Sequence, residues 1–313
     1  MVINYPVLVI GFNRPLLLNN LLEHLSKIGV SKLYVSLDGP RDEQDALLCK
    51  QSFEVVKRYK HLFDLTVLYR PYNLGCCLGV VSALDWFFSE TDFGAVIEDD
   101  CLPNLEFFEF LSHIEQDKYS LNIATMKLYT AHNPFDFNFS NQLASTVLIH
   151  GWATFSQVWT RIRKDYFRLK LPSIVNNSGM KRTLPQAFYW WINSTRAKLG
   201  LIDTWDGIMN DQVWRLGFKT VIPERNLVDN LGYGPLATHT KDSNESNQIR
   251  LPRDVLVNND VDFLLNTYYF KIRWKHVFTA ITRAFLDYLK FFKRKKFEKL
   301  LKNDLSKRNI DFP

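Results

Sequence analysis

Short apolar runs alternate with helical patterns over the first 130 residues of the chain. Four continuous apolar runs have the length of buried strands and end at turn or polar residues. They cover residues 6–11, 33–38, 65–69 and 93–97. Helical spacing of apolar residues follows Pro15 and Gly75, and residues 43–61 form a more polar helical stretch. This alternation predicts an α/β fold with a mostly parallel sheet that helices cover on both faces.

Polar residues follow each of the predicted strands at its carboxyl end. They are Asn13 and Arg14, then Asp38, then Asn73, and finally Glu98, Asp99 and Asp100. Ligands of parallel sheets bind outside the carboxyl ends of the strands, so these side chains should meet at one rim. The sequence therefore predicts a polar binding site at that rim.

Glu98, Asp99 and Asp100 form the strongest single signal at the predicted rim. Three adjacent carboxylates repel one another, and a divalent cation that also binds phosphate is a common way to offset that repulsion. The competing interpretation is an ordinary solvated acidic turn. The position directly after a buried strand favours the functional interpretation.

Two other rim residues, taken singly, each allow a structural and a functional interpretation. Asp38 lies in Ser36-Leu37-Asp38-Gly39-Pro40, where it could form an Asx-type turn or accept hydrogen bonds from a nucleotide base or ribose. Arg14 could be a surface cation at a helix start or could contact phosphate, because a guanidinium suits oxyanions. Together with the carboxylates, they suggest a nucleotide-diphosphate site.

The rest of the chain divides into three stretches. Residues 131–250 are rich in Trp and Gly and are expected to shape the acceptor site on the same sheet. Residues 251–267 are polar and turn-rich, which predicts a linker. Residues 268–313 carry a basic, aromatic helical pattern that predicts an amphipathic tail.

Composition narrows the classes of protein that fit. The chain has 313 residues, with 46% hydrophobic and 23% charged, which is typical of a globular protein. It has no apolar run of membrane-spanning length, and its N-terminus lacks the features of a secretory signal. The four cysteines, Cys49, Cys76, Cys77 and Cys101, have no metal-site spacing and predict reduced thiols in a cytoplasmic protein.

The formal net charge of +6 is concentrated in the tail. Residues 271–313 hold 13 Lys and Arg against 4 Asp and Glu, whereas the remaining residues hold 26 against 29. This distribution disfavours nucleic-acid binding by the body and favours an anionic partner for the tail.

Seven sequence motifs in a fixed order resemble those of the GT-A glycosyltransferases. PVLVIGFNRP, VSLDGPR, YNLGCCLGVVSALDWFF and GAVIEDDCLPN resemble the nucleotide-sugar half, and HGWATFSQVW, TWDGIMNDQVWRLGFKTVIPE and NLGYGPLATHT continue the likeness. The chain is most similar to the bacterial nucleotide-diphospho-sugar transferases related to N-acetylglucosaminyltransferase I. The resemblance covers about residues 5–240 and implies a GT-A-type, Rossmann-like fold with a C-terminal basic helical tail.

The resemblance implies a role for each matching residue of the first half. Arg14 and Asp38 would contact the nucleotide, and Asn73 and Gly75 would lie beside the sugar-nucleotide. Glu98 and Asp99 would hold the donor sugar and ribose. Asp100 would bind Mn²⁺ or Mg²⁺.

The second half supplies three further candidates. Asp211 stands where the family has its catalytic base, although the pair Trp205-Asp206 competes for that alignment. His239 could be a second metal or phosphate ligand, or an ordinary hydrogen-bonded loop histidine. Trp152 is the best candidate for an aromatic that faces the sugar, against the alternative of core packing.

These observations predict a metal-dependent, inverting glycosyltransferase that uses a nucleotide-diphosphate sugar, expected to be UDP-linked. The acceptor would be a glycan or a lipid-linked saccharide in surface polysaccharide synthesis, at the inner face of the cell membrane. One alternative is a sugar-nucleotidyltransferase, but Gly11-Phe12-Asn13-Arg14-Pro15 lacks the glycines of a phosphate loop. Another is a non-catalytic, membrane-peripheral carbohydrate-binding protein.

The tail allows three interpretations. Trp274, Phe278, Ile281, Phe285, Leu289 and Phe292 recur at helical spacing, and Lys290, Lys293, Arg294, Lys295 and Lys296 follow. The helix could pack on the body with a solvated basic end, bind nucleic acid, or lie in the interface of an anionic membrane. The acidic body disfavours nucleic acid.

Overall fold

The computed structural model describes residues 2–116, 127–135, 142–177, 179, 181–232 and 261–288. The four apolar runs form parallel strands: β1 (Val7–Gly11), β2 (Lys32–Leu37), β3 (Asp64–Tyr69) and β4 (Phe93–Glu98). The bounds of each strand lie within one residue of those predicted from the apolar pattern.

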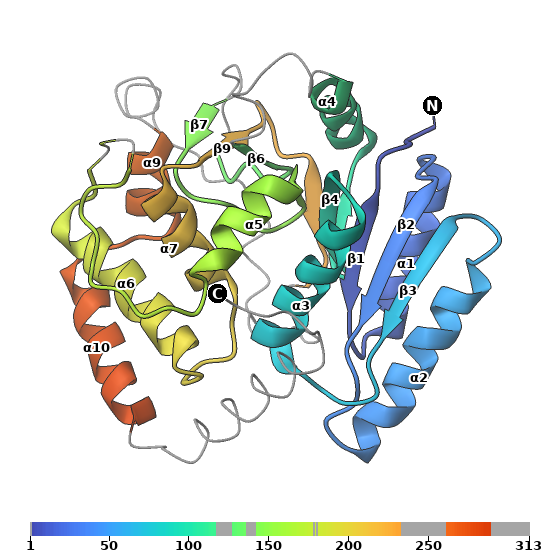
Figure 1. Ribbon diagram of the computed structural model, residues 1–313, viewed down its shortest axis with the longest axis horizontal. Helices are drawn as coiled ribbons and strands as arrows, with labels where there is room; N and C mark the ends of the chain where they lie inside the picture. Colours follow the sequence, from blue (N-terminus) through green and yellow to red (C-terminus); the bar gives the residue numbers. More distant parts are fainter. Residues whose placement is uncertain are drawn as a thin grey trace.

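Three helices connect these strands, as the helical spacing predicts: α1 (Pro15–Lys27), α2 (Glu43–Arg58) and α3 (Gly75–Glu90). Proline is tolerated in a first helical turn, and α1 begins at Pro15. α1 and α2 pack against each other, whereas α3 packs against α5 (Ser156–Lys164) (Figure 1). Every residue of α3 from 77 to 84 is buried because the helix lies between the sheet and α5.

The eight-stranded sheet has the order β3-β2-β1-β4-β8-β6-β9-β7. The remaining strands are β6 (Lys127–Thr130), β7 (Gln142–Ala144), β8 (Trp152–Phe155) and β9 (Lys219–Ile222). The chain runs outward from β1 through β2 to β3 and then returns to β4 on the other side of β1. This reversal creates a switch point between β1 and β4, where Ile10 pairs with Glu98.

The second half of the chain extends the same sheet. β8 pairs antiparallel with both β4 and β6, and β6 pairs parallel with β9. A small second sheet joins β5 (Cys101–Pro103) to β10 (Val228–Asn230). The helices of this half are α4 (Leu105–Gln116), α5, α6 (Leu184–Lys198) and α7 (Asp206–Leu216). The predicted halves 1–130 and 131–250 therefore share one sheet.

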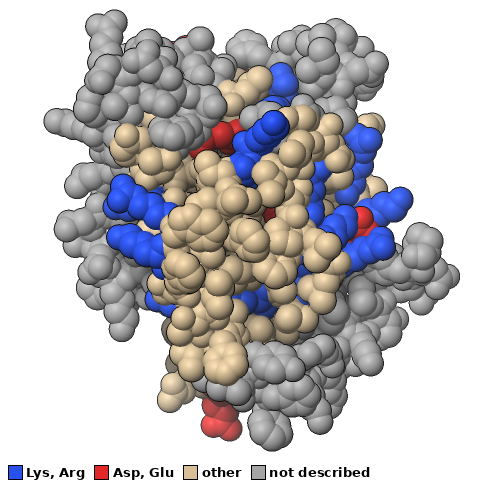
Figure 2. Space-filling view, turned by 90° about the vertical axis from the view of Figure 1, so that its left-hand side faces the viewer, with Lys and Arg blue, Asp and Glu red and all other residues tan. Residues whose placement is uncertain are grey.

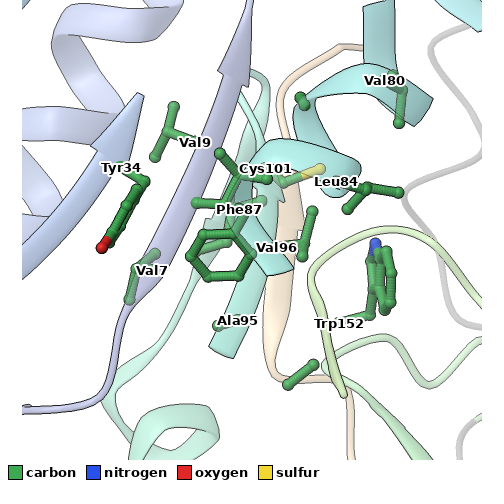
Figure 3. Close-up of a cluster of buried hydrophobic side chains, with 14 of the residues drawn as sticks. Val7, Val9, Tyr34, Val80, Leu84, Phe87, Ala95, Val96, Cys101 and Trp152 are labelled. Carbon is green, nitrogen blue, oxygen red and sulfur yellow. The ribbon is translucent and has the colours of Figure 1, made fainter. Parts of the chain in front are cut away.

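The core lies between β1, β4, β8 and the helices that cover them. Figure 3 shows Val7, Tyr34, Phe87, Val96 and Trp152 gathered in it, and all five are buried. Because side chains from both halves meet in this cluster, the packing that stabilises the sheet also fixes the relative position of the strand ends.

The linker predicted over 251–267 is wrong for its last part. Residues 261–264 form α9 (Val261–Leu264), and a π-helical turn, η3 (Leu265–Tyr269), follows directly. Val261, Leu264 and Leu265 are buried against Ile222 of β9 and neighbouring residues. The residues just before this segment are polar, so composition alone did not predict that Val261, Leu264 and Leu265 would be buried. Residues 251–260 lie outside the described part of the chain.

The tail forms α10 (Trp274–Tyr288), which packs along α6 (Figure 1). Leu289, Phe292 and the basic run from Lys290 lie outside the described residues. Of the helices that the structure describes, none is long and apolar enough to cross a membrane.

Candidate functional site

A cavity of about 390 Å³ opens at the carboxyl ends of β1, β2 and β4, at the switch point of the sheet. Seven side chains or glycines predicted from the sequence line it: Arg14, Asp38, Asn73, Gly75, Glu98, Asp99 and Asp100. Arg41, Arg70, His150, Asp203 and Asn230 also line it and were not predicted. The cavity therefore holds three arginines against five carboxyl groups.

Arg14 lies against the carboxylates that follow β4. Its Nε donates to Asp99 Oδ2 at 3.2 Å, its Nη1 donates to Asp100 Oδ2 at 2.8 Å, and its Nη2 donates to Asp99 Oδ1. The backbone N–H of Phe12 also donates to Asp99. Arg14, just after β1, thus supplies positive charge beside the three carboxylates.

Burial and mutual repulsion shift the titration of the triplet. Burial, together with the charges of Asp100 and Asp99, raises the pKa of Glu98 to about 8, although the charge of Arg14 and a hydrogen bond from Trp205 oppose the shift. Burial also raises the pKa of Asp99 to about 6, although the Arg14 charge lowers it. At neutral pH Glu98 is therefore largely protonated, which lowers the negative charge of the cavity.

Asp38, just after β2, forms hydrogen bonds to the residues that begin α3. Its carboxylate accepts hydrogen bonds from the backbone N–H groups of Gly39, Leu74 and Gly75 and from Asn73 Nδ2, at 2.9–3.1 Å. Burial raises its pKa to about 6 despite these bonds. The turn role considered for Asp38 is thus present, and the same carboxylate lines the cavity.

Asp203 is a site residue that the sequence analysis missed. Its carboxylate accepts hydrogen bonds from the backbone N–H groups of Cys76 (2.9 Å) and Cys77 (2.8 Å), in the first turn of α3. Gly75 has a φ of +83°, and a Cβ there would lie 2.6 Å from Asp203 Oδ2. The only signal for Asp203 in the sequence is its place in the polar and aromatic segment Asp203-Thr204-Trp205-Asp206. That segment does not predict a hydrogen bond to Cys76, 127 positions away.

Asp211, the predicted base, is not among the residues that line the cavity. Its side chain is 4% exposed and is held by Lys198 Nζ at 3.2 Å and Arg215 Nε at 2.9 Å. Ser194 Oγ donates to the same carboxylate. Lys198 and Arg215 therefore enclose this carboxylate and offset its charge.

Asp206, the competing candidate, does not line the cavity either, and it is half-buried. It begins α7 and accepts a hydrogen bond from Thr204 Oγ1. Its charge acts on Cys76 and on His150, which both line the cavity. Burial lowers the pKa of His150, and the charges of Asp100 and Asp206 oppose that shift.

Two other predicted site residues are not at the cavity wall. Trp152 is 1% exposed and packs against Trp205, with 6.1 Å between ring centroids, which is the core packing considered as the alternative to a sugar contact. It belongs to β8, which lies between β4 and β6 and whose four residues are all buried. His239 lies outside the described residues.

Asp100 and its neighbours offer oxygen atoms that a divalent cation could use. No three His, Cys, Asp or Glu side chains within the described ranges form a metal cage. Magnesium-type sites, however, use one or two carboxylates together with substrate phosphates and water. Asp100 and Asn230 meet this need: a Cβ on Gly232 would lie 2.3 Å from Asp100 Oδ2 and 3.0 Å from Asn230 Oδ1. The donor set fits a cation that arrives with phosphate.

The comparisons with known proteins give slight similarities only. No protein-family model matches the chain, and no curated protein matches it. Among solved structures, HddC from Yersinia pseudotuberculosis is 15% identical, covers 49% of this chain and 77% of its own, and has a TM-score of 0.32.

Two other solved structures have names that refer to sugar phosphates. A putative glucose-1-phosphate thymidylyltransferase from Bacillus anthracis, solved with sucrose, is 12% identical, covers 60% of this chain and 82% of its own, and has a TM-score of 0.33. Mannose-1-phosphate geranyltransferase from Thermus thermophilus is 11% identical, covers 73% and 76%, and has a TM-score of 0.34. These values are too low to carry functional conclusions to this chain.

Proposed function

We propose that the chain is a metal-dependent, inverting glycosyltransferase that moves a sugar from a nucleotide-diphosphate donor, a UDP-sugar, to a glycan or lipid-linked saccharide. The observation that supports it is the convergence of Arg14, Asp38, Asn73 and the carboxylate triplet on one cavity at the switch point of the sheet. Doubly wound sheets bind nucleotides at this position.

The charge of the cavity favours a cation as a companion of the donor. Three arginines face five carboxyl groups, so a diphosphate alone would meet net repulsion even with Glu98 protonated. Asp100 would hold Mn²⁺ or Mg²⁺ there, and Asn230 is the nearest further oxygen ligand. Such a cation, when bound, stabilises the negative charge of the departing diphosphate.

The remaining polar groups of the rim would position the donor. Arg14 would turn from the carboxylates to the diphosphate, since a guanidinium binds both. Asp38 and Asn73 would contact the base and the sugar-nucleotide, next to Gly75. Glu98 and Asp99 would hold the donor sugar and ribose, and a protonated Glu98 can donate a hydrogen bond to a sugar oxygen.

Asp206 takes the place of Asp211 as the proposed base. An inverting transfer needs one carboxylate that accepts the proton of the acceptor hydroxyl. The charge of Asp206 acts on Cys76 and His150, which line the cavity, and the adjacent Trp205 donates to Glu98. The segment from Asp203 to Asp206 therefore connects the second half of the chain to both α3 and the triplet.

A sugar-nucleotidyltransferase is the alternative within the enzymes. Such an enzyme would cradle phosphates with free backbone N–H groups after β1. In this chain the N–H of Phe12 donates to Asp99. That N–H is therefore taken up by a carboxylate rather than offered to a phosphate, which favours glycosyl transfer over nucleotidyl transfer.

The proposal places the acceptor at the inner face of the cell membrane. The surplus of 13 Lys and Arg over 4 Asp and Glu in residues 271–313 supports an anionic surface as a partner.

Product analysis tests the proposed reaction. The purified protein is incubated with a panel of nucleotide-sugars, saccharide acceptors and Mn²⁺, and nucleotide products are separated. We expect release of the nucleoside diphosphate, lost on addition of a chelator. Release of nucleoside triphosphate that requires pyrophosphate would instead support nucleotidyl transfer, and sugar binding without turnover would support a carbohydrate-binding protein.

A further inference from the structure

Helix α10 presents its large apolar side chains to solvent. Trp274, Phe278, Ile281 and Phe285 are 47%, 63%, 48% and 63% exposed. Their spacing of four, three and four residues places them on one stripe of the helix. Four large apolar side chains in one exposed row form a patch that a monomeric surface rarely carries without a partner.

The face of α10 that contacts the body uses smaller side chains. Val277 and Ala280 are buried against Ile192 of α6, and Ala284 packs against the same cluster. Arg196 Nη2 of α6 also forms an ion pair with Asp287 of α10 at 2.6 Å. A helix whose only role was to cover the body would turn its largest apolar residues inward. In α10 the arrangement is the reverse, so core packing does not account for the aromatic stripe.

The exposed stripe continues onto α6 through a row of rings. The ring centroids of Phe278 and Trp274 are 6.2 Å apart, and those of Trp274 and Phe188 are 6.4 Å apart. Phe188 in turn contacts Trp191, at 6.2 Å. Aromatic side chains from two helices therefore form one continuous surface.

A loop far away in the sequence joins this surface. Trp191 Nε1 donates to the backbone oxygen of Lys170 at 2.7 Å, which holds the loop beside α6. On either side of Lys170, Leu169 is 54% exposed and Leu171 is 81% exposed. We call the exposed residues Trp274, Phe278, Ile281, Phe285, Leu169 and Leu171 the apolar face.

Positive charge lies next to the apolar face. Lys271, Arg273, Lys275 and Arg283 are all exposed, and Figure 2 shows a tan surface with Lys and Arg on both sides of it. The only acidic residue in the sequence of α10, Asp287, is paired with Arg196. A second copy of this chain would bring like charges together, whereas anionic lipid headgroups would complement them.

We infer that the apolar face docks on the surface of an anionic membrane, with its aromatic and aliphatic side chains in the headgroup boundary and the flanking Lys and Arg on the lipid phosphates. This inference shares with the proposed function a location at the membrane, but it depends on the surface alone and not on the reaction. The docking element is then the folded helix α10 with the loop at Leu169–Leu171.

Co-sedimentation of the full-length protein with lipid vesicles tests the inference. Vesicles of phosphatidylcholine with phosphatidylglycerol are compared with vesicles of phosphatidylcholine alone, at low salt. The test variant is Phe278→Ser/Phe285→Ser, which changes two exposed side chains and leaves the buried contacts of α10 intact. The matched control is Leu16→Ser/Leu47→Ser, whose side chains are 77% and 61% exposed on α1 and α2.

We expect the wild type and the control to bind the anionic vesicles and the Phe278→Ser/Phe285→Ser variant to bind at least about tenfold more weakly, because two buried phenyl groups are lost from the interface. Equal binding by the two variants would overturn the inference. So would light scattering that shows a wild-type dimer converted to a monomer by the test variant, since a second copy would then be the partner. Donor binding, measured on the same samples by thermal shift, is expected to be unchanged, which separates this result from a failure of the proposed reaction.

Discussion

Arg14 Nη1 lies 2.8 Å from Asp100 Oδ2, across the gap between the ends of β1 and β4. The carboxylate proposed to hold a cation is thus paired with a guanidinium. A diphosphate would attract Arg14 and leave Asp100 to the cation, so the two ligands should bind cooperatively. Cation affinity without nucleotide should accordingly be weak.

Removal of the Arg14 charge tests this competition. Arg14→Met keeps an apolar stem of similar length and frees Asp99 and Asp100. Mn²⁺ should then bind the nucleotide-free protein about tenfold more tightly, as expected when one adjacent positive charge is lost. Nucleotide-diphosphate binding should weaken. Calorimetric titration with each ligand measures both effects, and an unchanged or weaker Mn²⁺ affinity would contradict the competition.

Ionisation of Glu98 should lower the free energy of unfolding as pH rises. Its folded-state pKa of about 8 lies above its ordinary value of 4.5, so the folded state holds the proton through this interval while the unfolded state loses it. The free energy of unfolding should therefore decrease between pH 5 and pH 8. Glu98→Gln mimics the protonated side chain and should reduce this decrease by about 1 kcal/mol or more. Denaturant unfolding of the metal-free proteins at both pH values measures the difference, and parallel pH profiles would refute the assignment.

Asp206→Asn should lower transfer and leave the fold intact. The amide keeps the size of the side chain and can still bond to Thr204, but it cannot accept a proton. General-base catalysis contributes about 10²–10⁴-fold, so turnover should fall by that range while donor binding is retained. A loss below tenfold, or products that retain the anomeric configuration, would exclude Asp206 as the base.

Asp211→Asn should lower the free energy of unfolding rather than the rate of transfer. Loss of this carboxylate leaves Lys198 and Arg215 without their buried counter-charge, and removal of one partner from a buried pair costs about 3–5 kcal/mol. The melting temperature should fall, while turnover per folded molecule should stay near wild type at low temperature. The exposed Asp64→Asn is the control for both measurements. A stable Asp211→Asn protein with abolished turnover would restore Asp211 as a catalytic candidate.

The local pattern of the first half predicted its strands and its rim well. Each strand is a continuous apolar run, and the carboxyl ends of parallel strands meet at one rim, so the pattern predicts the rim but not the order of the strands. Arg14 and Asp99 meet because β1 and β4 are neighbours at the switch point. The sequence could not show that the arginine itself neutralises the carboxylates.

Residues of the second half were less predictable because their roles depend on distant partners. Asp211 and Asp206 both lie on α7, and Asp211 is enclosed by Lys198 and Ser194 of α6 together with Arg215 of its own helix. Trp152 follows a glycine as a loop aromatic could, yet β8 pairs with both β4 and β6 and carries the ring into the core. Asp203 reaches α3 through tertiary structure alone.

The sequence of the tail predicted the outward face of α10 but not its inward face. The apolar spacing of Trp274, Phe278, Ile281 and Phe285 predicted one helix and one stripe, and α10 has both. The pattern did not reveal that Val277 and Ala280 form a second, inward face against α6. Deletion of 269–313, the simplest test of the tail, would therefore uncover Ile192, and substitutions on the exposed face are the cleaner experiment.

Thermal stabilisation by nucleotide-diphosphate sugars, with and without Mn²⁺, tests the central claim most directly. The wild type should show a higher melting temperature with a UDP-sugar and Mn²⁺ together than with either alone, and Asp100→Asn should lose the part that depends on the metal. An equal shift in the presence of a chelator, or no shift with any nucleotide-sugar of the panel, would contradict the proposal that this cavity binds a nucleotide-diphosphate donor through a divalent cation.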